Sequence, residues 1–153
     1  MRIKFKIEPE KPMLRTRLFY SQNEMSFDML PKIYEANYYI QINYIQMTTG
    51  LNDEVIRLSG FCPIENIKEI PANPPTSNPG TLYISSDLEP GWTYSYASDW
   101  TVRRARGNWI CIGDCESVGE GVEFLESCVA VLNDGDIKSL WLQVVTGDFS
   151  DFI

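Results

Sequence analysis

The chain has 153 residues with a formal net charge of −8, and it contains no histidine. Without imidazole, the Ser-His-Asp triads, Cys–His pairs and HExxH zinc sites that serve many enzymes are excluded. The acidic balance argues against a surface that binds the phosphates of nucleic acid, because such surfaces are basic. We therefore expect one domain spanning residues 1–153 that has no cofactor and acts by binding, not as an enzyme.

The first quarter of the chain predicts a strand and a helix. Residues 3–7 alternate between apolar and basic side chains, the pattern of a half-buried strand, and residues 13–20 are its expected partner. Ser26 and the apolar spacing that follows it predict a helix over residues 26–36. Pro31 opposes this interpretation, because an interior proline removes a helical hydrogen bond.

Residues 37–80 predict further strands and a long loop. The Tyr- and Ile-rich run at 37–47 predicts one long strand, and residues 55–61 are expected to pair back onto it. Pro63 is expected to begin a short helical turn, since isoleucines recur at every third residue after it. Residues 71–80 contain four prolines and predict an extended loop within the single domain.

The second half predicts strands throughout. Residues 92–103 alternate with a period of two, which predicts one bent strand or two strands broken near Asp99. Residues 109–112 are apolar on both faces and predict a central strand, and residues 133–136 (Asn-Asp-Gly-Asp) predict a type I′ hairpin. We expect about eight to ten short strands in a mainly β fold, or in an α+β fold with minor helix. The sheet should be largely antiparallel and either barrel-like or sandwich-like.

The four cysteines are expected to be reduced. The N-terminus has alternating charges and lacks the apolar core of a signal peptide, and no stretch is apolar enough to cross a membrane, so we expect a cytoplasmic protein. Only Cys111 and Cys115 lie close in the sequence, whereas a four-cysteine zinc site usually has two close pairs. No metal site is expected, and a redox role for this pair stays open. Core packing is the expected role of Cys62, Cys111, Cys115 and Cys128.

The carboxylates show no specific catalytic or metal-binding pattern. Residues 114–126 are acidic but lack the spacing of a calcium-binding loop, and Asp134 and Asp136 are explained by the hairpin that contains them. The glycines of residues 113–121 do not follow a phosphate-binding pattern. A catalytic carboxylate pair of the glycosidase kind stays possible, but nothing marks two such residues among the 21 acidic ones.

The net charge lies in the last third of the chain. Residues 1–106 carry 12 basic and 12 acidic side chains, whereas residues 107–153 carry nine acidic side chains against Lys138 alone. Such a region is either a solvated face that maintains solubility or a surface that attracts a basic partner. The aromatic residues of 92–100 most simply pack in the core; if exposed, they could stack on sugar or nucleic acid, or anchor a protein partner.

Two segments of the chain resemble a known group of bacterial proteins. The sequences GNWICIGD (107–114) and GVEFLESCVAVLNDGDIKSLWLQVV (121–145) are similar to immunity proteins of contact-dependent growth inhibition and other polymorphic toxin systems. Residues 109–124 also resemble the SUKH superfamily of immunity proteins, in which an acidic, glycine-rich loop follows an apolar strand and leads to another strand. The similarity is one of strands and turns and contains no catalytic motif.

The resemblance implies a cytoplasmic inhibitor that binds the C-terminal toxin domain of a cognate effector. A nuclease toxin is basic because it binds phosphate, so an acidic inhibitor can cover its active site, without itself contacting nucleic acid or a membrane. The alternatives are a non-catalytic adaptor domain, a carboxylate-dependent enzyme and a small-ligand β-barrel. The expected partner-binding residues are Asp114, Glu116, Glu120, Glu123 and Glu126, with Trp92 and Tyr94 as apolar anchors.

Overall fold

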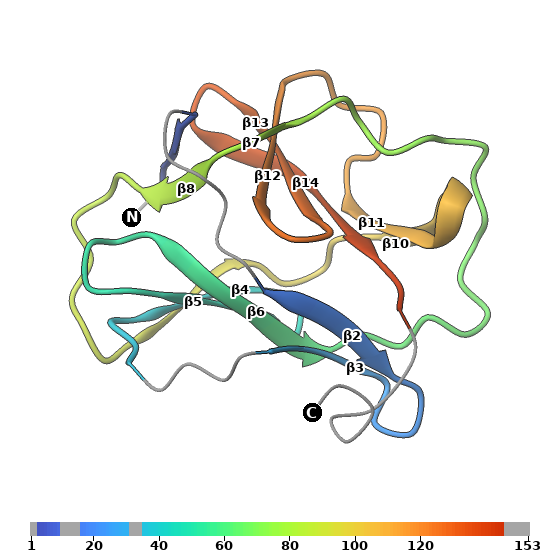
Figure 1. Ribbon diagram of the computed structural model, residues 1–153, viewed down its shortest axis with the longest axis horizontal. Coiled ribbons are helices and arrows are strands. Elements are labelled where there is room, and N and C mark those ends of the chain that lie inside the picture. The colour runs from blue at the N-terminus through green and yellow to red at the C-terminus, as the bar shows by residue number, and fades with distance from the viewer. Residues whose placement is uncertain (1–2, 10–15, 31–34, 146–153) are drawn as a thin grey trace.

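The structure, a computed structural model, describes residues 3–9, 16–30 and 35–145 (Figure 1). Within these residues the chain forms fourteen strands and one 3₁₀ turn at Arg106–Asn108, and no helix is long and apolar enough to cross a bilayer. Two six-stranded sheets pack face to face as a sandwich, and a two-stranded ribbon lies beside them. The prediction of a mainly β, largely antiparallel, sandwich-like fold is confirmed, but the expected number of strands is too low.

The N-terminal sheet is formed mainly by the first half of the chain. In order across the sheet, its strands are β2 (Arg17–Ser21), β3 (Ser26–Leu30), β6 (Val55–Phe61), β5 (Ile45–Thr49), β4 (Tyr39–Ile42) and β9 (Thr93–Ala97). Neighbouring strands are antiparallel except β4 and β9, which run parallel. In β3 and β4 every second side chain is buried, so one face of this sheet meets the core and the other is partly exposed.

The C-terminal sheet is more deeply buried. Its strands, in order, are β10 (Val102–Arg104), β11 (Trp109–Gly113), β14 (Asp136–Gln143), β13 (Cys128–Asn133), β12 (Glu120–Leu125) and β7 (Asn78–Pro79). All pairs are antiparallel except β12 with β7. The ribbon consists of β1 (Phe5–Glu8) and β8 (Thr81–Ile84), also antiparallel. Consecutive buried residues in β11 and β13 show that this sheet is covered on both faces.

The main core lies between the two sheets. Ile40, Met47 and Leu58 enter it from the N-terminal sheet, and Ile110 and Leu140 enter it from the C-terminal sheet; each of these side chains is fully buried. They belong to one continuous apolar cluster, whose removal from water is the main stabilising contribution to such a fold.

A second, smaller cluster covers the outer face of the C-terminal sheet. Trp141 and Val129 from the sheet pack there with Ile70 and Ala72 from residues 68–80, a segment that we call the strap. The strap is tied to β10 by two backbone hydrogen bonds, from the N–H of Arg104 to the carbonyl of residue 68 (2.9 Å) and from the N–H of Ile70 to the carbonyl of Arg104 (2.8 Å). In Figure 1 it runs as a green trace around the outer side of this sheet to β7. The Pro-rich segment is therefore extended, as predicted, and packs on the sheet.

Two predictions for the first quarter of the chain are wrong. The described part of the predicted helix at 26–36 contains strand β3, because Phe27 and Met29 are buried with a period of two; residues 31–34 lie outside the described residues. The strand at residues 3–7 is present as β1, but its partner is β8. Of the expected partner, residues 13–20, the last four residues belong to β2, which pairs with β3 instead, and 13–15 lie outside the described residues.

Two further predictions also fail in residues 37–70. The run at 37–47 is a hairpin of β4 and β5, because Asn43 adopts the left-handed φ of 53° that asparagine tolerates in turns. The expected pairing of residues 55–61 with this run is confirmed, as β6 pairs with β5. The predicted helical turn after Pro63 is absent from the structure. Ile64 packs in the main core and Ile70 packs in the second cluster, so the regularly spaced isoleucines do not share one helical face.

The predictions for the second half are largely confirmed. Residues 92–103 contain two strands, β9 and β10, which belong to different sheets. Residues 109–112 lie in β11, which is paired on both sides. In the hairpin of β13 and β14, Asp134 and Gly135 have φ angles of 51° and 78°, the two positive values that a type I′ turn requires.

The expectation that all four cysteines are reduced is wrong. Cys111 and Cys115 form a disulfide, with Cα atoms 6.0 Å apart, because the chain folds back after β11 and brings Cys115 to the outer face of the sheet. Cys62 and Cys128 are free thiols and are buried, in agreement with the predicted packing role.

Candidate functional site

Three of the predicted partner-binding acids lie at one end of the C-terminal sheet. Asp114 and Glu116 are exposed in the β11–β12 loop, and Glu120 begins β12. The Asp114 carboxylate accepts a hydrogen bond from the N–H of Glu116 (3.1 Å), and the Asp114 carbonyl accepts one from the Ser117 hydroxyl (2.8 Å), which makes the loop compact. None of the three acids forms an ion pair within the described part of the chain. We call these three residues the acidic end.

The other two predicted acids lie at the opposite end of β12. Glu126 is exposed in the β12–β13 turn, and the Glu123 carboxylate accepts a hydrogen bond from the N–H of Ser127 (3.1 Å), whose φ is 63°. Since a strand rises about 3.3 Å per residue, Glu120 and Glu126 are separated by roughly 20 Å. The five predicted acids therefore form two groups and do not share one compact site.

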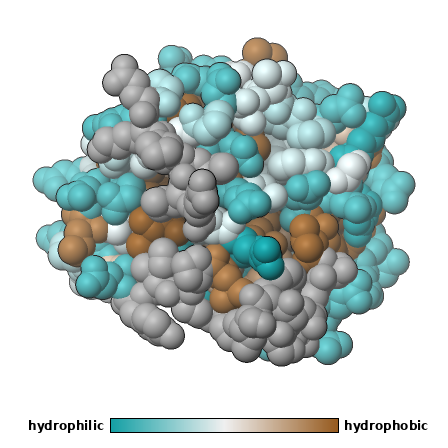
Figure 2. All heavy atoms as spheres, in the orientation of Figure 1, coloured by the Kyte–Doolittle hydropathy of each residue, from teal (hydrophilic) through white to brown (hydrophobic). Residues whose placement is uncertain are grey.

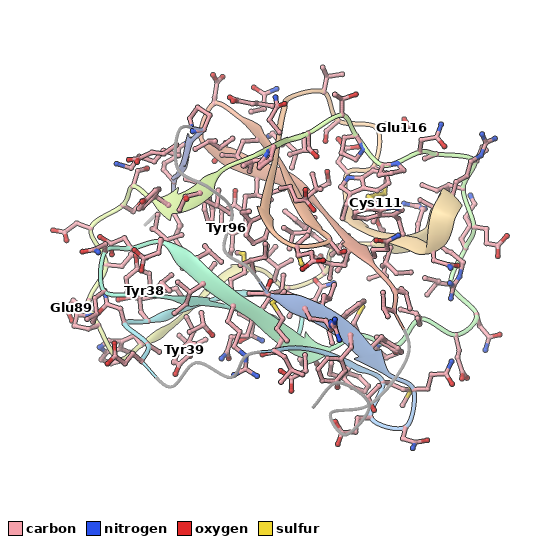
Figure 3. The ribbon with its side chains drawn as sticks, in the orientation of Figure 1. Tyr38, Tyr39, Glu89, Tyr96, Cys111 and Glu116 are labelled. Atoms are coloured by element: carbon pink, nitrogen blue, oxygen red, sulfur yellow. A yellow bond between two sulfur atoms is a disulfide. The ribbon has the colours of Figure 1, made fainter. Side chains whose placement is uncertain are left out.

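The predicted aromatic anchors belong to the other sheet. Trp92, which is 62% exposed, precedes β9, and the ring of Tyr94 packs edge-on against Tyr38 with centroids 6.0 Å apart. The Tyr94 hydroxyl accepts a hydrogen bond from the N–H of Glu89 (3.0 Å). Figure 3 shows Tyr38 and Glu89 at one side of the molecule and Glu116 at the other. The structure does not bring these aromatic residues together with the acidic end.

An open cleft of about 910 Å³ lies beside the acidic end, where the connection from β9 to β10 faces the start of β14. We call it the Trp100 cleft. Aromatic and charged side chains line it, notably Tyr96, Trp100, Asp99, Asp114, Asp136 and Lys138. Asp114 of the acidic end therefore lines the same cleft as Tyr96, Asp99 and Trp100, which were not among the predicted partner-binding residues.

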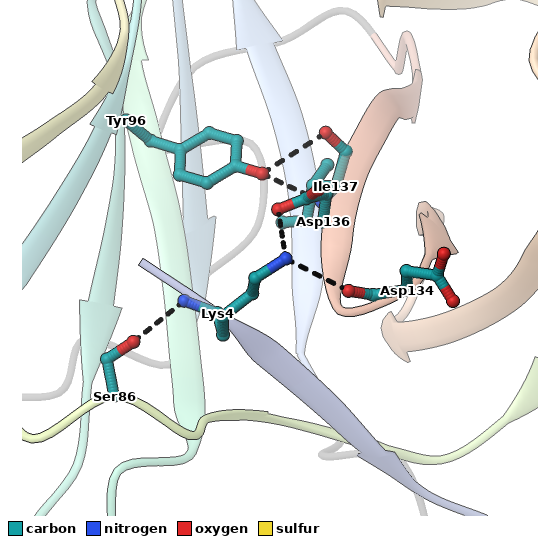
Figure 4. Close-up of polar contacts among 6 residues, drawn as sticks. All are labelled: Lys4, Ser86, Tyr96, Asp134, Asp136 and Ile137. Carbon is teal, nitrogen blue, oxygen red and sulfur yellow. Dashed lines mark hydrogen bonds and ion pairs between the residues drawn. The ribbon is translucent and has the colours of Figure 1, made fainter. Parts of the chain in front are cut away.

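An aromatic ladder supports the inner wall of the Trp100 cleft: Tyr96 and Trp100 line the cleft, and the buried ring of Phe5 packs behind them. Phe5, Tyr96 and Trp100 stack edge to face, with centroid distances of 5.2 Å and 5.9 Å between successive rings. The Tyr96 hydroxyl accepts a hydrogen bond from the N–H of Ile137 (2.9 Å) and so connects β9 of one sheet to β14 of the other (Figure 4). The wall is thus held by both sheets.

Lys4 neutralises one of the three aspartates of the cleft. Its ammonium group lies 3.1 Å from the Asp136 carboxylate and donates to the carbonyl of Asp134 (3.1 Å), while its N–H donates to the Ser86 hydroxyl (2.8 Å; Figure 4). The side chain of Asp136 is 10% exposed and that of Lys4 is 38% exposed, so the carboxylate is largely shielded from water while the lysine is partly solvated. Asp136 is therefore a structural carboxylate.

A second hollow of about 230 Å³ adjoins the cleft at the end of the sandwich. Tyr44, 69% exposed, and Phe61, 42% exposed, stack edge to face at its rim with centroids 6.2 Å apart. We call it the Tyr44 hollow. Asp99 and Trp100 line both the cleft and the hollow, so these two residues form the wall between them.

The two free thiols lie in surroundings that keep them protonated. Burial raises the pKa of the Cys62 thiol to about 11, and burial raises that of Cys128 further, with Glu123 and Glu126 adding to the effect. Both thiols are therefore protonated and unreactive at neutral pH. In the described part of the chain no three metal-ligating side chains converge. The cleft and the hollow offer carboxylates, aromatic rings and hydroxyls, which are groups suited to binding.

Sequence reasoning missed the wall residues for a physical reason. Trp100 belongs to the aromatic alternation that favoured core packing, and Asp99 was the expected break in it. The turn at Asn43 and Tyr44 was concealed in a predicted long strand. The available signal was Asn43 itself, since asparagine readily takes the positive φ that turns a strand into a hairpin.

Comparison of the chain with protein-family models gave no match, and a search of curated proteins found no significant relative. Function is therefore inferred from the charge and geometry of the chain itself.

Proposed function

We propose that this protein is a non-catalytic immunity protein of the cytoplasm, which binds a cognate bacterial toxin domain and covers its active or substrate-binding site. The observation that supports this proposal is the acidic end: Asp114, Glu116 and Glu120 gather beside the Trp100 cleft without a cationic partner in the described chain. A toxin that acts on nucleic acid is basic, and complementary charge speeds association and favours the correct partner. A nuclease is therefore the toxin class that the charge favours.

The rest of the site is compatible with a binding role. Trp100 and Tyr44 offer partly exposed aromatic surface beside the carboxylates, and aromatic residues dominate the energetics of protein interfaces. Glu123 and Glu126 lie at the far end of β12, so we assign them to a separate contact or to none. The same holds for Trp92 and Tyr94 on the other sheet.

The functional test is co-expression of this protein with the toxin domain encoded beside its gene. Bacterial cells should survive toxin induction only when the protein is present. Because cytoplasmic thiols reduce disulfides, binding should be measured with the Cys111–Cys115 pair both oxidised and reduced. Survival without a physical complex would contradict the proposal. Protection that fails while the protein binds another bacterial partner would favour the adaptor alternative.

The role of the acidic end is tested by charge reversal. In the triple variant D114K/E116K/E120K, association with a basic toxin at low salt should slow by at least about tenfold and lose most of its salt dependence. The matched control is E24K/E65K/E89K, which changes the net charge equally at exposed positions elsewhere. Stopped-flow association rates at two ionic strengths provide the measurement. Equal slowing in both triple variants would show that only the net charge matters and would remove the acidic end from the interface.

A further inference from the structure

The wall between the Trp100 cleft and the Tyr44 hollow is built with unusual rigidity. The side-chain amide of Asn43 donates to the Trp100 carbonyl (2.9 Å) and its oxygen accepts from the Trp100 N–H (2.9 Å). The indole ring lies against Gly113, where an added Cβ would be 2.8 Å from the ring and where φ is 107°. Trp100 is therefore fixed through its backbone and its ring, so little conformational entropy is lost when a ligand contacts it.

Trp100 and Asp99 both have unused binding capacity. The Trp100 indole N–H has no hydrogen-bond acceptor in the described part of the chain and is not a fully buried atom. Asp99 is exposed and forms no ion pair there. A donor and an anion are thus available on residues that line both cavities, a combination that matches a cationic side chain and the backbone carbonyl beside it.

The charge of the Trp100 cleft is negative. Lys4 neutralises Asp136, which leaves Asp99 and Asp114 against Lys138, the one cation among the described residues that line the cleft. Asp114 and Glu116 also line a neighbouring hollow with Lys68 and Arg103, which offset part of this charge, while Glu120 begins β12 on the same side of the sheet. A phosphate would be repelled here, whereas an arginine or lysine side chain would be attracted.

The Tyr44 hollow supplies an apolar counterpart. Tyr44 and Phe61 expose much of their rings, and Met25, 38% exposed, lies close by because its carbonyl accepts the Cys62 N–H (2.8 Å). Figure 2 shows hydrophilic residues over most of one face of the molecule, with hydrophobic ones gathered in a band across its middle. Exposed apolar groups that adjoin a charged cleft are typical of contact sites for protein segments.

We propose that the Trp100 cleft and the Tyr44 hollow together bind one basic, extended segment of a protein partner. An arginine side chain stacks on Trp100 and pairs with Asp99, the indole N–H donates to a backbone carbonyl of the segment, and the next apolar side chain occupies the Tyr44 hollow. Arginine suits this site better than lysine, because its planar guanidinium stacks and pairs at once. This inference rests on the proposed function only in taking the partner to be a basic protein.

The probes are capped tripeptides titrated into the ¹⁵N-labelled full chain, with the indole N–H signals followed by NMR. The peptide acetyl-Leu-Arg-Leu-amide should shift the Trp100 signal saturably, and acetyl-Leu-Gln-Leu-amide and acetyl-Gly-Arg-Gly-amide should bind about fivefold more weakly. The Trp92 indole, exposed elsewhere, is the internal reference. Asp99→Asn should remove the preference for arginine over glutamine, whereas Asp87→Asn, at an exposed position outside the cleft, should preserve it.

The outcomes separate this site from the proposed function. Equal binding of the arginine and glutamine peptides, or equal shifts of Trp92 and Trp100, would overturn the inference, as would the absence of any saturable shift. Saturable binding of chitotriose or maltotriose with no peptide response would assign the cleft to sugar and would also overturn it. If the peptides bind as expected but the toxin domain is not neutralised, the segment-binding site stands and the immunity function fails. If the toxin domain binds and is neutralised without shifting the indole N–H signal of Trp100, the immunity function stands and the segment-binding site fails.

Discussion

The outer faces of the two sheets are built differently. On the N-terminal sheet the outer face carries half-buried polar and aromatic residues, such as Tyr39 and Gln41, which alternate with core residues along β4. On the C-terminal sheet Trp141, Val129 and Val131 are only 2–3% exposed on the corresponding face, under the strap and beside the disulfide. The C-terminal sheet is thus covered on both faces, whereas the N-terminal sheet is covered mainly on its inner face, except along β2, where Leu18–Ser21 are all buried.

This difference explains two features of the sequence that are otherwise unrelated. Strands buried on both faces need continuous apolar runs, as in residues 109–112 and in β13, whereas a strand buried on one face needs only alternation. The second face also needs a cover, and the Pro-rich strap supplies one with little regular structure of its own. The cleft lies where the loop end of the C-terminal sheet meets β9 of the N-terminal sheet.

The largest effect that we expect tests the second cluster directly. Trp141→Ala should lower the free energy of unfolding by about 3–5 kcal/mol, because it empties a buried site and removes the indole donor to Ser139 (3.0 Å). Tyr39→Ala, on the open face of the other sheet, should cost less than half as much. Urea denaturation followed by far-UV circular dichroism measures both. Equal losses would mean that the strap gives the C-terminal sheet no energetic advantage.

The disulfide should contribute less than the packing beside it. Cys111 and Cys115 close a ring of about five residues, for which the chain-entropy relation gives about 2 kcal/mol. Cys115→Ala should lose this amount, and a phosphine reductant should lower the stability of the wild type to nearly the same value without affecting the variant. Unfolding curves with and without reductant, with thiols counted in parallel, give the answer. If the unfolding free energy of the wild type stayed unchanged in reductant while all four thiols were detected, the disulfide would contribute nothing to stability.

The disulfide also illustrates where sequence reasoning reached its limit. The C-x₃-C spacing was visible, but whether two cysteines bond depends on how the loop after β11 folds back, and that path is set by Gly113 with its φ of 107° and by tertiary contacts. The β class, the hairpin at 133–136 and the central strand β11 were accessible, because each follows from a local pattern.

The strand pairing and the site residues that the sequence does not predict depend on long-range contacts. The helix expected at 26–36 and the pairing of residues 3–7 failed because strand partners are chosen by tertiary packing, which a local pattern does not contain. The candidate site was predicted only in part for the same reason. The charge of Asp114 is visible in the sequence, but Asp99, Trp100 and Tyr44 meet only once the β9–β10 connection and the β4–β5 turn come together.

A smaller effect concerns the two buried free thiols, Cys128 in β13 of the C-terminal sheet and Cys62, which follows β6 and lines the Tyr44 hollow. The raised thiol pKa values mean that folded Cys62 and Cys128 stay protonated while the unfolded thiols ionise, so stability is full below pH 9 and falls as pH rises. For Cys62, the shift from 9.0 to about 11 corresponds to a loss of about 1.4 kcal/mol by pH 10. Cys62→Ala and Cys128→Ala should each reduce the fall in unfolding free energy between pH 8 and pH 10 by about this amount. A reduction in one variant only would show that water reaches the other thiol in the folded protein.

The smallest effect concerns the ion pair of Asp28 and Arg57 on the open face of the N-terminal sheet. The two side chains are 29% and 19% exposed and the Arg57 Nε is buried, so water and salt screen their attraction only in part, and Asp28→Asn should lower the unfolding free energy by about 1 kcal/mol. Asparagine keeps an oxygen that can accept the Met29 N–H (2.8 Å), so the substitution removes the charge while preserving this hydrogen bond. Urea denaturation in low and high salt should show the difference shrinking as salt rises. If Asp28→Asn lowered the unfolding free energy by about 2 kcal/mol at both salt concentrations, water would be excluded from this outer face as it is from that of the C-terminal sheet. The contrast between the two sheets would then fail.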